Sequence, residues 1–193
     1  NFFFFFFSPT LIIMLLFGHR NMPEAIAAMI LVKAVIASFT FSYFLSKKFD
    51  NKTPLISAFG VLYACSGYFI AYYWNVMWLD SFYLFPLVIL GIEQLISQRK
   101  MKLYTITLAL TLITNYYMGY MVCIFSVLYF IYYFFSNFDF TDTYFGKLAG
   151  REKGIKGFLS WGYNNLRNSR FFDNGCKFAF CSIGAGMLSA FML

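Results

Sequence analysis

The chain has 193 residues, of which 61% are hydrophobic and only 12% are charged, and its mean hydropathy is +0.66. A soluble domain needs about 25% charged residues to keep its surface solvated, so this composition excludes that class and indicates an integral membrane protein. A formal net charge of +7 would be compatible with nucleic-acid binding. The positions of the basic residues argue against such a partner.

The first segment is short for a membrane span. After Ser8 and Pro9, which have the signature of a helix start, too few apolar residues precede the polar break at His19 and Arg20 to cross a bilayer, which takes about 20 residues of helix. We therefore expect residues 1–17 to form an interfacial or extracytoplasmic helix, with a truncated span as the alternative. The chain starts in a phenylalanine run without methionine and stops inside an apolar stretch, so we expect a piece truncated at both ends.

Prolines, polar loops and an aromatic turn at 74–78 divide the remainder into helices, and aromatic turns of this kind mark membrane boundaries. The fold class that we predict is an all-α polytopic transmembrane helix bundle, with one partial transmembrane domain over 1–193. Its predicted parts are spans at about 23–46, 54–73 and 79–97, a helical hairpin at 103–114 and 117–135, a cytoplasmic loop at 136–175, and the start of a further span at 176–193.

The basic residues predict the orientation. Thirteen of the fifteen lie in the three stretches 47–52, 99–102 and 136–177, and the positive-inside rule places such stretches in the cytoplasm. The turn at 74–78 is then outside. The charge also has a natural partner in anionic membrane lipid, so we expect no nucleic acid.

The uninterrupted apolar run at 103–135 has basic stretches at both ends. As one helix it would measure about 50 Å, too long for a straight span of a hydrocarbon core about 30 Å thick. The polar residues at 115–120 are where it can turn, which predicts the hairpin with its tip outside. A single tilted helix, which would leave 136–177 outside, is the alternative.

Two charged residues lie within predicted spans. Lys33 is near the middle of its span, so it should face the bundle interior and meet a carboxylate, a carbonyl or a lipid phosphate, or else serve packing alone. Glu93 is one turn from the cytoplasmic end, and we expect it to reach the interface. The four cysteines show no metal-ligand spacing and the chain has no nucleotide-binding motif, so we expect free thiols, no metal and no cofactor.

Polar and aromatic residues gather at the predicted outer face. Asp80 is a weak candidate for a catalytic carboxylate, although an N-cap or a helix-dipole partner explains it equally well. Trp78 can also be a simple membrane-belt residue. The residues that we predict to bind substrate at an outer cleft are Arg20, Asn75, Trp78, Asn115, Tyr116, Tyr117 and Tyr120.

Several segments together resemble the bacterial YfhO membrane protein family over nearly the whole chain, least across 136–174. They are Ser8-Pro9, MPEAI at 22–26, SAFGVLYACSGY at 57–68, WNVMWLD at 74–80, PLVILGIE at 86–93 and NYYMGYMVCIF at 115–125. The resemblance implies a GT-C-like glycosyltransferase that works outside the plasma membrane of a bacterium. The donor would be a polyprenyl-phosphate sugar, and the acceptor a cell-envelope polymer such as lipoteichoic acid.

The resemblance also implies that the main catalytic carboxylate lies in an outer loop upstream of Asn1. The chain alone would then be inactive, as an early fragment of the transmembrane module. A transporter or flippase of a lipid-linked or amphiphilic substrate fits the composition and topology as well, and a purely structural scaffold is a third possibility.

Overall fold

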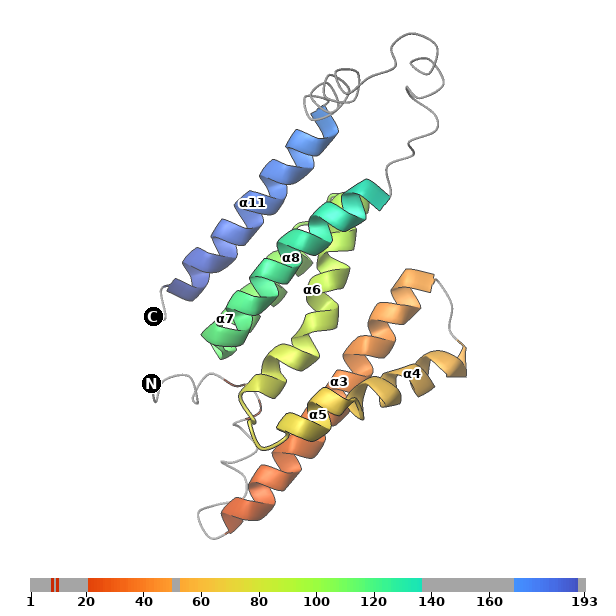
Figure 1. The fold of residues 1–193 in the computed structure, drawn as a ribbon, viewed down its shortest axis with the longest axis vertical. Coiled ribbons are helices and arrows are strands. Elements are labelled where there is room, and N and C mark those ends of the chain that lie inside the picture. The colour runs from red at the N-terminus through yellow and green to blue at the C-terminus, as the bar shows by residue number, and fades with distance from the viewer. Residues whose placement is uncertain (1–7, 9, 11–20, 50–52, 137–168, 191–193) are drawn as a thin grey trace, which may run out of the picture.

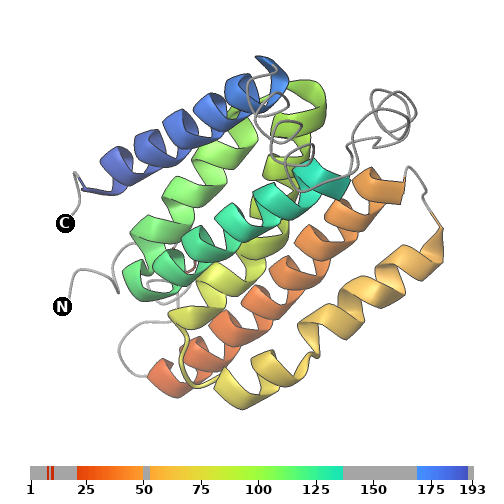
Figure 2. The same ribbon diagram turned by 45° about the horizontal axis from the view of Figure 1, so that its top comes forward.

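The computed structural model describes residues 8, 10, 21–49, 53–136 and 169–190. Within these ranges all the regular structure is helical, in a bundle of side-by-side helices (Figures 1 and 2). In the described part of the chain, four helical stretches are long and apolar enough to cross a membrane: Met22–Phe49, Pro54–Tyr72, Trp78–Gln98 and Tyr116–Tyr133. The predicted all-α polytopic bundle is confirmed.

Helix α6 (Trp78–Gln98) is the centre of the bundle. One of its faces packs on α3 (Met22–Phe49), where Tyr83 and Leu84 form a small core with Ala37. Farther along the same helix, Val88 and Ile92 belong to the main core, which is shared with the three later helices. Helices α3 and α6 run in the same direction (Figure 1), so residues at the same level of the two helices can meet.

The predicted span at 54–73 is interrupted in the structure. It consists of α4 (Pro54–Ala64) and α5 (Gly67–Tyr72), separated by Cys65 and by Ser66, whose backbone is extended. Glycine is about 1 kcal/mol less favourable than alanine inside a helix, and serine is a preferred residue before a helix start. The Ser66-Gly67 pair therefore favours a break at this point, a signal that the sequence contained and that the single-span prediction passed over.

The apolar run at 103–135 is divided at Asn115 into α7 (Lys102–Thr114) and α8 (Tyr116–Ser136). The two helices lie antiparallel against each other (Figures 1 and 2). Gly119 makes the close approach possible, since a Cβ at this residue would come 3.0 Å from the Cα of Leu112. How often this pair crosses the bilayer stays a prediction.

The last described helix, α11 (Ser169–Ala190), begins seven residues before the predicted start at 176. It lies along α7, and its residues Phe178, Cys181 and Ala185 complete the main core. Its first turns are polar, and an ion pair of Asp173 with Lys177 at 2.6 Å lies on them. Residues 1–7, 9, 11–20 and most of the predicted loop at 136–175 lie outside the described residues.

Two glycines set the distances between neighbouring helices. Gly60 of α4 faces α3, where a Cβ would come 2.6 Å from the Ser38 carbonyl oxygen. Gly91 of α6 faces α7, where a Cβ would come 2.7 Å from the Cα of Tyr104. Small residues at such contacts let helix backbones approach closely, as is usual for helices that associate within a membrane.

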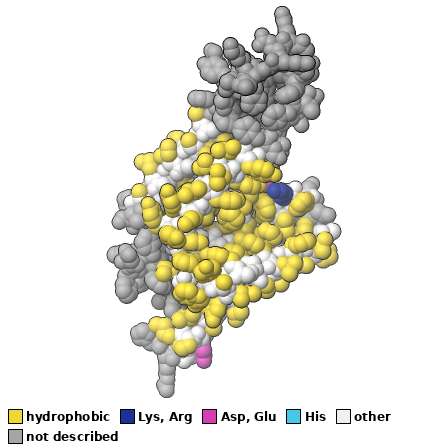
Figure 3. Space-filling view, viewed as in Figure 1, with side chains coloured by type: hydrophobic (Ala, Val, Ile, Leu, Met, Phe, Trp, Pro, Cys, Tyr) yellow, Lys and Arg dark blue, Asp and Glu magenta, His cyan; other side chains and the backbone are white. Residues whose placement is uncertain are grey.

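The surface of the bundle is strongly apolar. Figure 3 shows one face on which hydrophobic side chains extend almost without interruption over the described part of the chain. Among the described residues, large apolar side chains such as Leu31, Phe39 and Leu128 are more than half exposed. Exposing an apolar face of this size to water is unfavourable, whereas contact with the hydrocarbon of a bilayer is favourable.

Candidate functional site

Aromatic rings gather at the end of the bundle formed by the start of α6, the turn before it and the α7–α8 turn. We call this the outer end, because the basic stretches that we assign to the cytoplasm lie at the other. Trp78 packs against Tyr117 of α8, with ring centroids 6.4 Å apart, and against Tyr72 of α5 at 5.4 Å. Two of the residues predicted to bind substrate, Trp78 and Tyr117, are thus brought together from distant parts of the chain.

The rings at the outer end continue inward as a ladder. Tyr72 contacts Tyr68, which stacks on Phe82 of α6 at 5.4 Å. Phe82 stacks on Tyr63, and Tyr63 on Phe41 of α3, each pair at 4.4 Å and nearly parallel. Offset stacks of this kind contribute about 0.5–1.5 kcal/mol per pair beyond burial of their area. The ladder ties α3, α4, α5, α6 and α8 to one another at the outer end.

We call the rings of Trp78, Tyr116, Tyr117 and Tyr120 the aromatic rim. Asp80 lies beneath this rim and is buried. Its side chain is 1% exposed, and Oδ1 forms an ion pair with Lys33 Nζ at 2.6 Å. The same ammonium donates a hydrogen bond to the Val76 carbonyl at 2.7 Å. The prediction that Lys33 faces the interior is therefore confirmed, and of the partners expected for it the structure shows a carboxylate and a carbonyl. The geometry leaves no room for a substrate atom at Asp80 unless this pair opens.

A second ion pair joins the same two helices near their other end. Lys48 Nζ of α3 lies 2.8 Å from Oε1 of Glu93, which also accepts a hydrogen bond from Tyr129 Oη at 2.6 Å. The expectation that Glu93 reaches the interface is wrong, because its residue is only 7% exposed. A lysine and a tyrosine, from α3 and α8, supply the partners that solvent would otherwise provide.

Asn115 has a structural task in the α7–α8 turn. Its Oδ1 accepts a hydrogen bond from the Met118 backbone N–H at 3.2 Å, and its carbonyl accepts one from Gly119 at 2.8 Å. This is the arrangement of an asparagine at a helix N-cap. The side chain is buried, so its oxygen serves the start of α8.

The other predicted substrate-binding residues differ in position. Tyr116, Tyr117 and Tyr120 are each more than half exposed at the start of α8. Asn75 is half-buried in the turn before α6, where its carbonyl accepts the Trp78 N–H at 2.9 Å. Arg20 lies outside the described residues.

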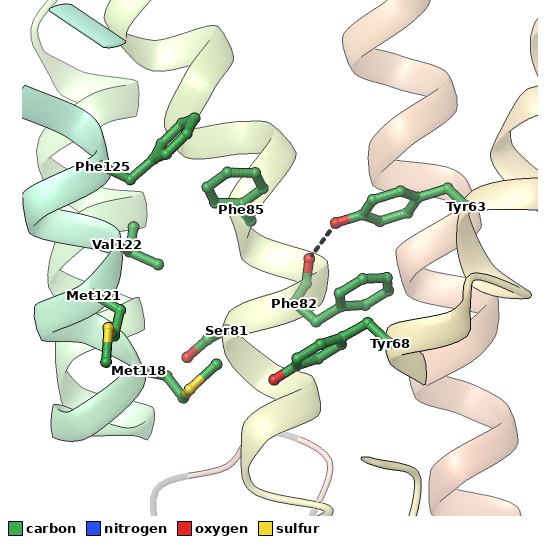
Figure 4. Close-up of a pocket in the computed structure, with 9 residues that line it drawn as sticks. All are labelled: Tyr63, Tyr68, Ser81, Phe82, Phe85, Met118, Met121, Val122 and Phe125. Carbon is green, nitrogen blue, oxygen red and sulfur yellow. Dashed lines mark hydrogen bonds between the residues drawn. The ribbon is translucent and has the colours of Figure 1, made fainter. Parts of the chain in front are cut away.

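A groove that sequence reasoning missed opens beside the aromatic ladder. It has a volume of about 440 Å³ and an almost entirely apolar wall, with α6 between α8 on one side and α4 and α5 on the other (Figure 4). The lining residues are Tyr63, Tyr68, Ser81, Phe82, Phe85, Met118, Met121, Val122 and Phe125. Its residues come from four helices, so no single stretch of sequence signals it. We call it the outer groove.

A proline shapes one wall of the outer groove. Pro86 lies inside α6 and has no N–H for the carbonyl four residues before it, which belongs to Phe82. The Tyr63 hydroxyl donates to that carbonyl at 2.9 Å (Figure 4). A side chain of α4 thus satisfies a backbone acceptor that water could not reach within a bilayer.

Comparisons with known proteins place the whole chain in one family. No curated protein and no solved structure matches it. A family described as bacterial membrane protein YfhO matches over residues 2–193. The chain therefore belongs to the YfhO family of bacterial membrane proteins.

Proposed function

We propose that the chain is part of a membrane glycosyltransferase of the bacterial plasma membrane. It would transfer a sugar from a polyprenyl-phosphate carrier to a cell-envelope polymer, such as lipoteichoic acid, on the extracytoplasmic side. Family membership supports a multi-pass membrane protein, and the aromatic rim at the outer end supports the reaction class. The reaction itself is our proposal.

The observation that carries the proposal is the meeting of Trp78 with Tyr117, next to the exposed rings of Tyr116 and Tyr120. Exposed aromatic faces offer a sugar ring a stacking surface, and phenol hydroxyls can bind its oxygen atoms. In the predicted orientation the rim lies at the boundary of membrane and water, where tryptophan and tyrosine are enriched. A lipid-carried sugar presents its head at this same level.

Asp80 enters the proposal as a positioning residue. A general base must come within about 3 Å of the proton that it removes, whereas the Asp80 carboxylate is fully buried against Lys33. Because Lys33 also holds the Val76 carbonyl, the pair fixes the turn that carries Trp78. A direct catalytic role for Asp80 would require the ion pair to open during turnover.

The test is sugar transfer by the protein in liposomes, with a polyprenyl-phosphate sugar as donor and a polyglycerol phosphate as acceptor. Trp78→Leu and Tyr117→Leu should each lower kcat/KM for transfer about three- to tenfold, mainly through KM, because they remove a stacking surface. Tyr132→Leu is the matched control, since Tyr132 is an exposed tyrosine of α8 farther along the helix.

The alternative is a transporter or flippase of a lipid-linked or amphiphilic substrate, which the apolar outer groove also favours. The same liposomes separate the two functions. Absence of transfer, together with movement of the lipid-linked sugar between leaflets, would reject the glycosyltransferase and establish the transporter. Transfer that the rim variants leave unchanged would reject the role of the rim.

A further inference from the structure

The outer groove contains two hydroxyl groups without hydrogen-bond partners. Ser81 is 2% exposed, and neither its Oγ nor the buried Oη of Tyr68 has a partner among the described residues. In Figure 4 the Ser81 oxygen lies on the α8 side of α6, and the Tyr68 hydroxyl lies in front of α6, directed toward the same side. An unsatisfied hydroxyl in an apolar environment costs roughly 1–3 kcal/mol, so these two hydroxyls favour a ligand that offers an acceptor atom.

The remainder of the wall indicates what else this ligand carries. The groove measures about 440 Å³, within the range of roughly 300–1,000 Å³ for ligand pockets, and five of its nine lining residues are aromatic. The groove is open to the surface of the bundle along α8, because the lining residues Met121 and Phe125 are 49% and 41% exposed. In a bilayer, such an opening faces hydrocarbon chains, and leaving the groove empty would forfeit dispersion contacts along its length. The material at hand to fill it is a lipid chain.

Depth and charge identify the acceptor atom. Ser81 is three residues after the rim residue Trp78, about 4.5 Å deeper along the helix axis, which is just below the headgroup level where tryptophan rings lie. Glycerolipids carry their ester carbonyls at this boundary. None of the described residues that line the groove is Lys, Arg or His, so a phosphate oxygen would be buried there without a counter-charge, which is costly. A neutral carbonyl fits this environment.

We propose that the outer groove binds one ester-linked fatty acyl chain of a glycerolipid from the outer leaflet. The ester carbonyl accepts hydrogen bonds from the Ser81 and Tyr68 hydroxyls, and the chain lies along Phe85, Val122 and Phe125. The site is separate from the ion pair of Lys33 with Asp80, and it does not depend on whether the protein transfers a sugar.

The experiment compares two lipids that differ only in the carbonyl. The full chain, purified in detergent and stripped of lipid, is titrated with diester phosphatidylglycerol and with its diether analogue, and bound lipid is measured by native mass spectrometry. We expect the diester to bind about five- to tenfold more tightly, since it restores two hydrogen bonds of moderate net strength. Equal affinities would overturn the proposal.

Variants locate the effect. Ser81→Ala combined with Tyr68→Phe should reduce the diester affinity to that of the diether, while Thr105→Ala with Tyr132→Phe, which removes two hydroxyls elsewhere, should preserve the preference. The ratio of the two lipids is measured within each variant, so a general loss of folding does not imitate the result. A double variant that still prefers the diester would contradict the role of the hydroxyls.

A bulky side chain in the outer groove tests whether the acyl chain lies there. Met121→Trp should weaken binding of both lipids, whereas Leu128→Trp, on the exposed part of α8 outside the groove, should not. Polyisoprenyl phosphate serves as the competitor. If it displaces phosphatidylglycerol at lower concentration, and Met121→Trp abolishes that competition, the groove belongs to the isoprenoid carrier and the acyl assignment is wrong.

Discussion

The charged residues of the bundle show how a membrane protein places ions in hydrocarbon. Both ion pairs between α3 and α6 use a lysine of α3 and a carboxylate of α6. Lys48 follows Lys33 by fifteen residues and Glu93 follows Asp80 by thirteen, so the pairs are about 20 Å apart along parallel helices. Together they fix the register of α3 against α6, since a shift by one turn would separate both.

The two pairs differ in burial, which leads to a prediction for their stability. Lys33→Met leaves the Asp80 carboxylate alone in the interior, and removing one partner of a buried pair costs about 3–5 kcal/mol. Lys48→Met should cost less, because the Lys48 side chain is 38% exposed and Glu93 keeps the hydrogen bond from Tyr129 as a partner. The measurement is the free energy of unfolding from a titration with sodium dodecyl sulfate.

The control for this prediction is the double variant Lys33→Met with Asp80→Leu. It removes both charges at once and should recover most of the loss, because no ion is left without a partner. The single variant Asp80→Leu is measured as well. If the double variant loses as much stability as Lys33→Met and Asp80→Leu together, the pair contributes no coupling and does not hold the helices in register.

The need of Lys33 for a partner could be read from the sequence, because an ammonium group in the middle of a span has to be satisfied. Its partner could not, since Asp80 is forty-seven residues away and the match depends on how α3 and α6 pack. Glu93 was misjudged for the same reason. Its distance from the helix end suggested the interface, whereas Lys48 and Tyr129 reach it from two other helices.

At the scale of the helices, close packing depends on glycine. Gly91 of α6 lies against the backbone of Tyr104 in α7, which cannot move aside as a flexible side chain would. Gly91→Ala should therefore lower the free energy of unfolding by about 1–3 kcal/mol through overpacking. Gly184 of α11 offers the matched control, because a Cβ there meets nothing within 4 Å, and alanine should be neutral or slightly stabilising in a helix.

The two alanine variants are compared in the same detergent unfolding titration, and the difference between them is the informative quantity. Equal effects would mean that helix propensity dominates and that the α6–α7 contact tolerates a methyl group.

Helix boundaries were largely predictable from prolines and polar breaks. The groove between α4, α5, α6 and α8 was not, because it exists only once these helices are packed.

At the scale of the whole molecule, the helix directions and the charge distribution together predict the orientation. Helices α3 and α6 both run toward basic stretches, and α7 and α11 run away from them. The aromatic rim lies at the opposite end. The positive-inside rule then places the rim and the outer groove on the extracytoplasmic side.

Single cysteines in a variant without the native four test this orientation. A membrane-impermeant maleimide on intact cells should label Trp74→Cys and Tyr116→Cys, which replace residues that are 65% and 51% exposed at the outer end. Lys100→Cys and Lys153→Cys should react only after the membrane is permeabilised, because they lie in basic stretches. Labelling of Lys153→Cys from outside, with Lys100→Cys protected, would mean that the run at 103–135 crosses the membrane once. A fully inverted pattern would place the rim in the cytoplasm, where a lipid-carried donor held outside could not reach it, and would reject the proposed function along with the orientation.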